Sequence, residues 1–174
     1  MDVPCVLREQ IEGAHEILED TMADVTPEQA RWSPPGRANP LGATYAHAIL
    51  AEDMLINGLL RGSAPLVATS FAAKAGLSEP PPPPDQDFGD WARRVQMDLT
   101  ALRQYAQAVY GNTTDYIRSL SEDDLNRTID MTSMGLGKQS LAWVLGNIVL
   151  WHINAHCGEV SCLKGLQGAR GYPF

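Results

Sequence analysis

The chain has 174 residues, of which 44% are apolar and 20% are charged, and its formal net charge is −8. This length and composition predict one globular domain spanning residues 1–174. The acidic balance argues against nucleic-acid binding, which depends on clustered Lys and Arg, and the lack of an apolar run of roughly 18 residues argues against a membrane span.

The start of the chain and its cysteines predict a cytoplasmic protein. The first residues include Asp2 and soon become a charged helical pattern, unlike a secretory signal. The cysteines, Cys5, Cys157 and Cys162, are odd in number and lack Cys-x-x-Cys spacing. This usage favours free thiols in a reducing compartment over disulfides.

The first predicted helix runs from about Pro4 to Ala23. Its charged face includes Glu12 and His15, which form half of the Glu-x-x-His pattern of di-iron bundles. That site needs a second such motif and further inward-facing glutamates, so we interpret both residues as solvated. The apolar positions recur every three or four residues, as in an amphipathic helix: Leu7, Ile11, Ala14, Leu18 and Met22.

A second long helix is predicted from about Leu41 to Leu60. Before it, Thr26 and Pro27 indicate a capped helix start, and Ser33-Pro34-Pro35-Gly36 interrupts the chain. The inward positions of the second helix place an imidazole in the core: Ala43, His47, Leu50 and Met54.

The second half of the chain predicts two more helices. Residues 63–86, with the run Pro80–Pro84, form a long crossover between the second and third helices. The third helix starts after Asp85 or Asp87 and reaches Leu120. An extended piece containing Gly135 and Gly137 then leads to the fourth helix, from about Gln139 to Leu166.

The fourth helix carries the most informative pair of residues, His152 and His156. At a spacing of four, both imidazoles project from one helix face and can bind one ion. With His47 they make three neutral imidazoles, which leave a position for water or substrate in a catalytic type of metal site. The alternative is three separate core histidines. The predicted inward stripe is Leu141, Leu145, Ile148, His152, His156, Glu159 and Leu163.

Residues next to the histidine pair limit the reactions that a site on this helix could catalyse. A zinc protease would have glutamate where Ile153 stands, which argues against peptidase activity. Cys157 is turned about 100° from the histidine face, which argues against a catalytic thiol. Glu159 shares that face and can orient a histidine, act as general base, serve as a fourth ligand, or simply reach solvent.

Taken in order, these motifs resemble the DinB/YfiT-like superfamily of metal-dependent four-helix bundles. The resemblance covers nearly the whole chain. It implies an all-α four-helix bundle with residues 63–86 as the crossover, and His47, His152 and His156 as the metal ligands. The matching features are the turn at Val25–Gln29, the break at Trp32–Pro35, His47, and His152-x-x-x-His156-x-Gly158.

The same resemblance implies a function. Members with an assigned role include transferases and isomerases that use low-molecular-weight thiols, so we expect a small-molecule substrate and a thiol cosubstrate. The expected cofactor is a divalent ion, zinc or nickel first and iron or manganese as alternatives, because imidazole sites choose weakly among them. Glu159, where relatives often have glutamine, is the candidate catalytic residue.

Two further expectations concern assembly and the absence of catalysis. Relatives commonly pair through bundle faces, and the tail Tyr172-Pro173-Phe174 is apolar for a free end, so we expect a homodimer. The alternative to an enzyme is a non-catalytic bundle protein that binds a metal or a small ligand.

Overall fold

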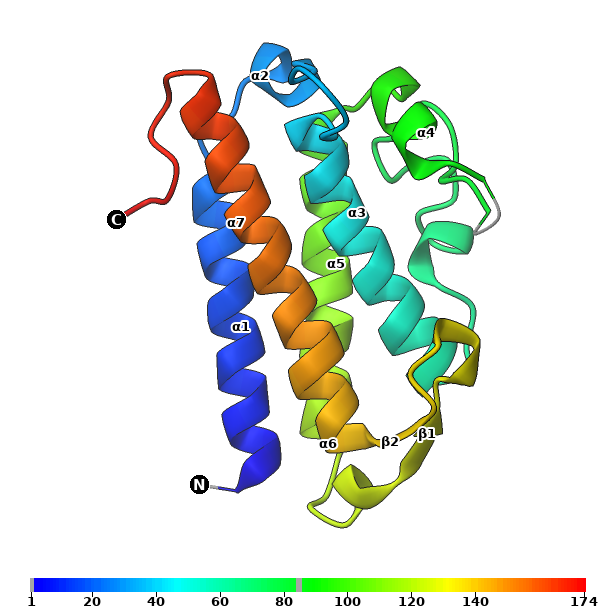
Figure 1. The fold of residues 1–174 in the computed structure, drawn as a ribbon. Helices are drawn as coiled ribbons and strands as arrows, with labels where there is room; N and C mark the ends of the chain where they lie inside the picture. The colour runs from blue at the N-terminus through cyan, green and yellow to red at the C-terminus, as the bar shows by residue number, and fades with distance from the viewer. Residues whose placement is uncertain (1, 84–85) are drawn as a thin grey trace.

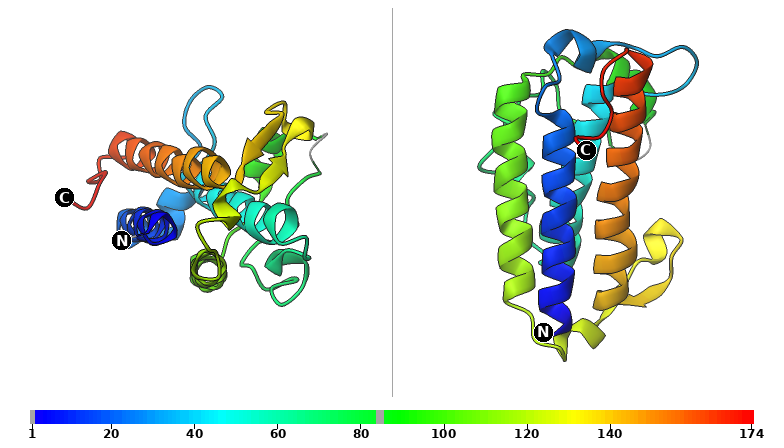
Figure 2. Two further views of the ribbon diagram at one scale, coloured as in Figure 1. Left: turned by 90° about the horizontal axis from the view of Figure 1, so that it is seen from below. Right: turned by 90° about the vertical axis from the view of Figure 1, so that its left-hand side faces the viewer.

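The computed structural model describes residues 2–83 and 86–174, and it is mostly helical. Four long helices run side by side in Figures 1 and 2: α1 (Val3–Met22), α3 (Leu41–Asp53), α5 (Leu99–Arg118) and α7 (Trp151–Leu166). Helix α3 packs against α7, and α1 packs against both α5 and α7. None of the helices in the described ranges is long and apolar enough to cross a membrane.

The first two helices begin where their caps predict. The Asp2 side chain accepts a hydrogen bond from the backbone N–H of Cys5 at the start of α1. Helix α2 (Pro27–Arg31) follows a capping box in which Thr26 and Gln29 exchange side-chain to backbone hydrogen bonds. The predicted helix start at Thr26 is therefore confirmed.

Both histidine-bearing helices contain a π-helical stretch. Helix α3 continues as a π-helix over Met54–Leu60, and α6 (Leu141–Val144) continues through a π-helix over Leu145–Leu150 into α7. A π-turn holds one extra residue, so it shifts every later side chain around the helix. Met54 was expected to face the core, but 55% of its surface is exposed. Met54 begins the π-stretch and shares a helix face with the half-buried His47, so its exposure comes from that face and not from the shift.

The same shift corrects the predicted stripe on the last helix. Leu141, Leu145 and Leu163 are buried as predicted, but the predicted positions between Leu145 and Leu163 are not, so His152 and His156 lie half-buried at the edge of the core. In that stretch the buried positions each lie one residue beyond a predicted one: Val149, Ile153, Cys157 and Val160.

The predicted third helix is two helices. Helix α4 (Phe88–Arg94) ends where Val95 turns extended, and α5 begins after Asp98, whose side chain caps two backbone N–H groups. Asp87 caps α4, and the alternative start at Asp85 lies outside the described residues. The crossover preceding α4 contains a short 3₁₀ helix, Leu66–Ala68. The break follows from tertiary pairing, because Leu77 bridges Met97.

Gly76 lets the crossover approach the start of α5. It has a positive φ of 76°, and a Cβ there would lie 2.5 Å from the carbonyl oxygen of Asp98. The backbone oxygen of Gly76 accepts a hydrogen bond from the N–H of Asp98. A side chain at this position would clash with backbone, so only glycine fits.

The extended piece before the last helix forms a small hairpin. Strands β1 (Thr128–Asp130) and β2 (Lys138–Ser140) pair antiparallel, with Thr128 opposite Ser140. Short 3₁₀ helices precede and interrupt the hairpin, at Asp124–Asn126 and Thr132–Met134. Because residues 138–140 pair in the sheet, the following helix begins at Leu141 and not at Gln139.

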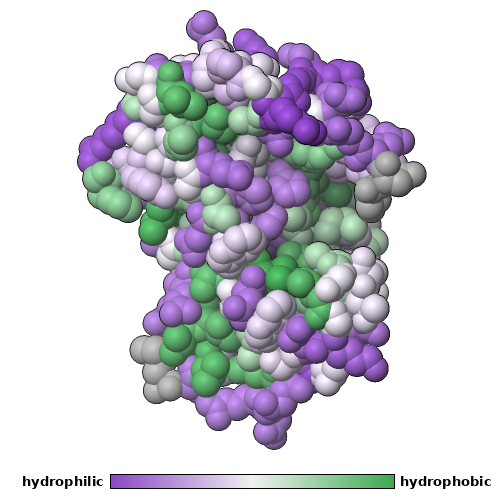
Figure 3. All heavy atoms as spheres, viewed as in Figure 1, coloured by the Kyte–Doolittle hydropathy of each residue, from purple (hydrophilic) through white to green (hydrophobic). Residues whose placement is uncertain are grey.

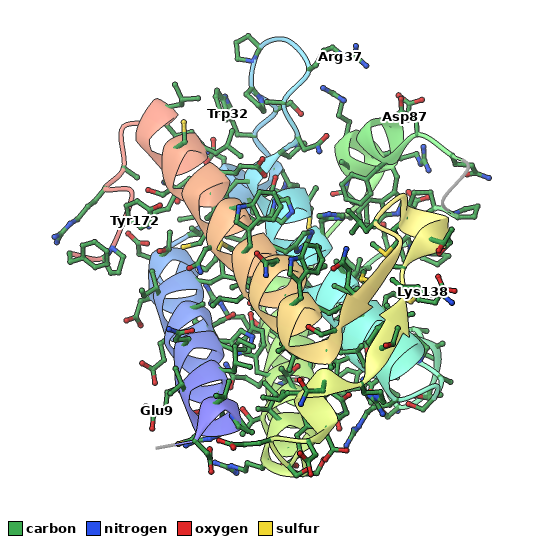
Figure 4. The ribbon with its side chains drawn as sticks, turned by 60° about the horizontal axis from the view of Figure 1, so that its bottom comes forward. Glu9, Trp32, Arg37, Asp87, Lys138 and Tyr172 are labelled. Atoms are coloured by element: carbon green, nitrogen blue, oxygen red, sulfur yellow. The ribbon has the colours of Figure 1, made fainter. Side chains whose placement is uncertain are left out.

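The core lies between the four long helices. On the face drawn in Figure 3, apolar and polar residues are interspersed over the surface. Beyond α7 the chain ends in a short tail that carries Tyr172 (Figure 4). Large side chains with under 2% exposure come from each long helix and include Ile11, Leu18, Tyr45, Ile49, Leu102 and Tyr105.

Candidate metal centre

The packing of α3 against α7 brings three histidines together. His47 lies in the middle of α3, while His152 and His156 lie one turn apart at the start of α7. Each offers one ligand nitrogen, and these atoms all lie within 4.8 Å of one another. The three residues singled out from the sequence thus form one cluster.

The three rings converge from different directions. The ring centroids of His152 and His156 are 4.3 Å apart, and those of His47 lie 5.1 Å and 4.9 Å from them. The rings are inclined by 52° to 86° to one another, so they do not stack. The Nε2 atoms of His152 and His156 are 3.0 Å apart. This arrangement directs ring nitrogens toward a common point.

Glu159 holds His156 from the other side of its ring. The Oε2 atom of Glu159 lies 2.7 Å from Nδ1 of His156. An ionised carboxylate only accepts hydrogen bonds, so the proton sits on Nδ1 and the lone pair of Nε2 faces His152. A carboxylate that orients a histidine is a common partner of metal ligands. Of the roles expected for Glu159, the contact in the structure is the one that orients the His156 ring.

Glu159 is not a member of the converging group, which consists of His47, His152 and His156 within the described residues. Its side chain is 60% exposed and thus reaches solvent as well as His156. The structure therefore gives no support to Glu159 as a fourth ligand. The role as general base stays a prediction.

Burial keeps two of the histidines uncharged. It lowers the pKa of His47 to about 4, with a further lowering by His156 and an opposing effect of Glu159. It lowers the pKa of His152 to about 3, with His156 and His47 acting in the same direction. Both imidazoles are neutral at pH 7, which is the form that binds metal.

Helix α4 supplies an aromatic cover on one side of the cluster. The ring of Phe88 meets that of His47 edge-on, with centroids 4.8 Å apart, and Trp91 packs behind Phe88 at 5.0 Å. Trp91 is 1% exposed, and its indole N–H has no hydrogen-bond partner among the described residues. Trp151, which precedes His152 in the chain, is 64% exposed.

His15, interpreted from the sequence as solvated, is buried. It is 5% exposed, and its Nε2 lies 2.9 Å from Oε2 of Glu52 on α3. The interpretation was wrong because α1 contacts α5 as well as α7, so its buried face is wider than the apolar stripe. Glu12 does lie near the surface, where it pairs with Arg8 at 2.7 Å.

Two buried carboxylates were not predicted from the sequence. Glu52 and Asp53 are 2% and 0% exposed, and Asp53 accepts a hydrogen bond from the hydroxyl of Tyr105 at 2.7 Å. Their sequence signal was two adjacent acidic residues inside an otherwise apolar helix. Such a pair is expected to be buried only when hydrogen-bond partners come from other helices, which the sequence does not show.

Comparison with known proteins places this chain in a family. The model of the DinB superfamily matches residues 10–160, a range that contains all three histidines. The crystal structure of a conserved protein from Enterococcus faecalis is similar, with a TM-score of 0.80 at 22% identity over 95% of this chain and 97% of that chain. No curated protein matches the sequence. Because the match spans most of its length, the chain belongs to the DinB superfamily.

Proposed function

We propose that this protein is a divalent-metal-dependent enzyme in which His47, His152 and His156 hold the ion. The supporting observation is the convergence of three ligand nitrogens within 4.8 Å from two packed helices. A site with three protein ligands and room for substrate is of the catalytic type, whereas structural sites are closed by four. We also propose that the fold is the four-helix bundle with a long crossover that the sequence predicts, and that this bundle holds the ion.

The donor set fits such an ion. Imidazole nitrogens suit zinc and nickel, and iron or manganese are alternatives, because these ions differ little in their preference for this ligand type. When bound, a divalent ion supplies a Lewis acid that polarises groups of the substrate. The neutrality of His47 and His152 at pH 7 leaves their lone pairs available.

The protein's own residues would position and deprotonate the substrate. Glu159 holds His156 through Oε2, and its Oε1 has no hydrogen-bond partner among the described residues. We assign Glu159 as the general base, which accepts a proton at Oε1 from a small thiol. Phe88 would form an apolar wall beside His47. By family resemblance, the reaction is a thiol-dependent transfer or isomerisation. The homodimer expected from relatives and from the apolar tail, and the cytoplasmic location expected from the first residues and the cysteines, belong to the same proposal.

A non-catalytic role in binding a metal or a small ligand is the second candidate. It is favoured by the aromatic cover of α4, because Phe88 and Trp91 occupy space on the His47 side of the cluster. The enzyme role and a non-catalytic metal-binding role both predict a bound ion, whereas a role in binding only a small ligand does not. The first two roles differ in whether a small thiol reaches the bound ion.

Cobalt substitution tests the proposal. Protein produced without an affinity tag is loaded with Co²⁺, and its visible spectrum is recorded with and without a low-molecular-weight thiol. We expect one ion per chain and a spectral change on thiol addition, followed by turnover in thiol conjugation or isomerisation assays. One ion with an unchanged spectrum would favour a non-catalytic metal-binding role, and no bound ion would contradict the enzyme and leave only the role in binding a small ligand.

A further inference from the structure

One buried side-chain donor in the described ranges has no hydrogen-bond partner, and it belongs to the aromatic cover of the candidate metal centre. It is the indole N–H of Trp91, a residue that is 1% exposed. Native proteins rarely bury a donor without a partner, because the donor gives up its bond to water and gains none in return. Trp91 therefore indicates an acceptor that none of the described residues supplies.

Phe88 links this donor to the candidate metal centre. Phe88 and Trp91 are three residues apart on α4, so they project from the same side of the helix. That helix packs against α3, which carries His47, and Asp87 marks its start in Figure 4. The ring of Phe88 contacts His47 at a centroid distance of 4.8 Å and Trp91 at 5.0 Å. One half-buried ring thus contacts both a candidate metal ligand and the indole that carries the unpartnered donor.

The ring of Phe88 can turn aside while α4 stays in place. At the C-terminal end of this helix, Arg93 donates to the carbonyl oxygens of Gly36 and Ala38, both at 3.3 Å. Phe88, by contrast, is the first residue of α4 and is half-buried. Side-chain rotamers at a binding surface often change on binding even where the backbone moves little. Because the indole nitrogen of Trp91 is fully buried, an acceptor reaches it only after a neighbouring side chain such as Phe88 has moved.

We propose that Trp91 determines substrate specificity: when Phe88 turns aside, the indole N–H donates a hydrogen bond to a carboxylate oxygen of the substrate. The inference rests on the proposed function, in which the substrate binds beside His47. In the structure Phe88 fills the place next to His47, which the substrate takes when it binds. The N–H of Trp91 then gains the acceptor that the described residues do not supply.

A carboxylate suits this place better than a neutral group does. An ionised carboxylate offers acceptors and no donor, which matches a single N–H. A hydrogen bond to an ionised acceptor is about twice as strong as one between neutral groups. His47, Phe88 and Trp91 carry no negative charge that would repel it, and the carboxylate of Glu159 is bonded to His156 on α7. The substrate class is therefore a small thiol acid and not a simple alkanethiol.

NMR of the full-length protein tests the hydrogen bond directly. The chain has four tryptophans, and the indole signal of Trp91 is identified by its loss in Trp91→Phe. The Zn²⁺-loaded protein is titrated with 3-mercaptopropionate and, in parallel, with propanethiol, which lacks the carboxylate. We expect the indole proton of Trp91 to shift downfield with 3-mercaptopropionate only. An equal shift with both thiols, or no shift with either, would overturn the proposal.

Two variants test the same contact through affinity. Trp91→Phe keeps an aromatic ring but lacks the N–H, so its preference for 3-mercaptopropionate over propanethiol should fall about tenfold. A loss of packing alone would weaken the binding of both thiols alike and leave the preference unchanged. Trp32→Phe is the matched control, because Trp32 lines a separate pocket with Arg31 and Gln167, and its preference should equal that of the wild type. An unchanged preference in Trp91→Phe would contradict the contact.

Phe88→Ala tests the movement of the ring. Without a ring to displace, this variant should bind 3-mercaptopropionate several-fold more tightly than the wild type does, because the binding-competent arrangement no longer has to be populated first. Phe71→Ala is the control, since Phe71 is also half-buried but packs on Tyr105, and it should bind as the wild type does. Equal or weaker binding by Phe88→Ala would show that the substrate does not displace the ring and would overturn the proposal.

The Co²⁺ spectrum separates failure of this inference from failure of the proposed function. A spectral change with both thiols, together with an unmoved Trp91 signal, would overturn the inference alone. No bound ion, or an unchanged spectrum with both thiols, would overturn the proposed function and the inference with it. Where Trp91→Phe does not fold, the Trp91 signal is identified by replacing the other three tryptophans in turn, and the titration of the wild type decides.

Discussion

Glu159 accepts a hydrogen bond from Nδ1 of His156 at 2.7 Å, while Nε2 of the same ring lies 3.0 Å from Nε2 of His152. The carboxylate therefore decides which nitrogen of His156 carries the proton. The other nitrogen is left facing the cluster with its lone pair. Through this one contact the exposed Glu159 orients a candidate metal ligand.

Removal of any clustered histidine should strongly reduce metal binding. We expect His47→Ala, His152→Ala and His156→Ala each to lower affinity by more than the 10–100-fold typical of an orienting partner, because a direct ligand is lost. His15→Ala should retain the metal, since His15 pairs with Glu52 outside the cluster. Metal content by mass spectrometry decides this. Full occupancy in two of the three cluster variants would refute the site.

Two substitutions of Glu159 should separate its roles. Glu159→Gln can still accept from Nδ1 of His156, so metal affinity should change little while turnover falls by about 10²–10⁴-fold, as for loss of a general base. Glu159→Ala also removes the orienting contact and should weaken metal binding by about 10–100-fold. Metal titration and turnover are measured on both variants. An unchanged rate in Glu159→Gln would leave Glu159 as a positioning residue.

The ion pair between Asp24 and Lys164 should make stability depend on pH. Lys164, with a side chain 4% exposed, donates to Oδ1 of Asp24 at 2.6 Å, and this bond lowers the pKa of Asp24. The unfolded state then binds the proton more readily than the folded state, so the stabilisation is present above the unfolded pKa of about 3.9 and is lost as pH falls through the folded value.

The measurement is urea denaturation of the wild type and Asp24→Asn between pH 7 and pH 3. Because the Asp24 side chain is 67% exposed and solvent screens the pair, we expect a difference of only about 0.5 kcal/mol in the free energy of unfolding at pH 7, which shrinks as the pH falls below about 4. Asp123→Asn is the control, because Asp123 is exposed and its side chain caps no helix. A difference between Asp24→Asn and wild type that stays constant over this pH range would contradict the assignment.

Replacing one member of the buried pair of His15 and Glu52 should lower the free energy of unfolding strongly, and replacing both should lower it by less than the two single losses together. Their side chains are 6% and 2% exposed. Glu52→Leu or His15→Leu alone leaves a buried polar partner, so each should lower the free energy of unfolding by roughly 3–5 kcal/mol. The double variant should lose less than the sum of the two. Additive losses in urea denaturation would show that the pair is not coupled.

The expected homodimer is tested by sedimentation. The rings of Tyr172 and Phe174 stack with centroids 5.5 Å apart, and Phe174 is 77% exposed. If this tail contributes to pairing, Phe174→Ser should shift the protein toward monomer, because apolar contact area is lost. A wild type that sediments only as monomer at micromolar concentration would contradict the dimer.

Long-range contacts explain most of the differences between prediction and structure. Periodicity placed α1 correctly, and the cap residue with the following proline placed the helix start at Thr26, because both signals depend on neighbours within a turn. Periodicity did not show the break between α4 and α5, where Leu77 pairs with Met97, or the partner of His15 on α3. It also did not show the π-turn at Leu145–Leu150, after which the buried positions from Val149 to Val160 lie one residue beyond those predicted.

The sequence by itself determined which functional groups the protein has and on which helices they lie. The chain is acidic and helical, with a histidine pair one turn apart on one helix and a third histidine on another. These properties are local, because a helix repeats every 3.6 residues whatever surrounds it. Only the tertiary structure decided that His47 meets His152 and His156, that Glu159 turns toward His156, and that His15 is buried beside Glu52. Each of these depends on how α1, α3, α5 and α7 pack, which side-chain shape and burial decide over the whole chain.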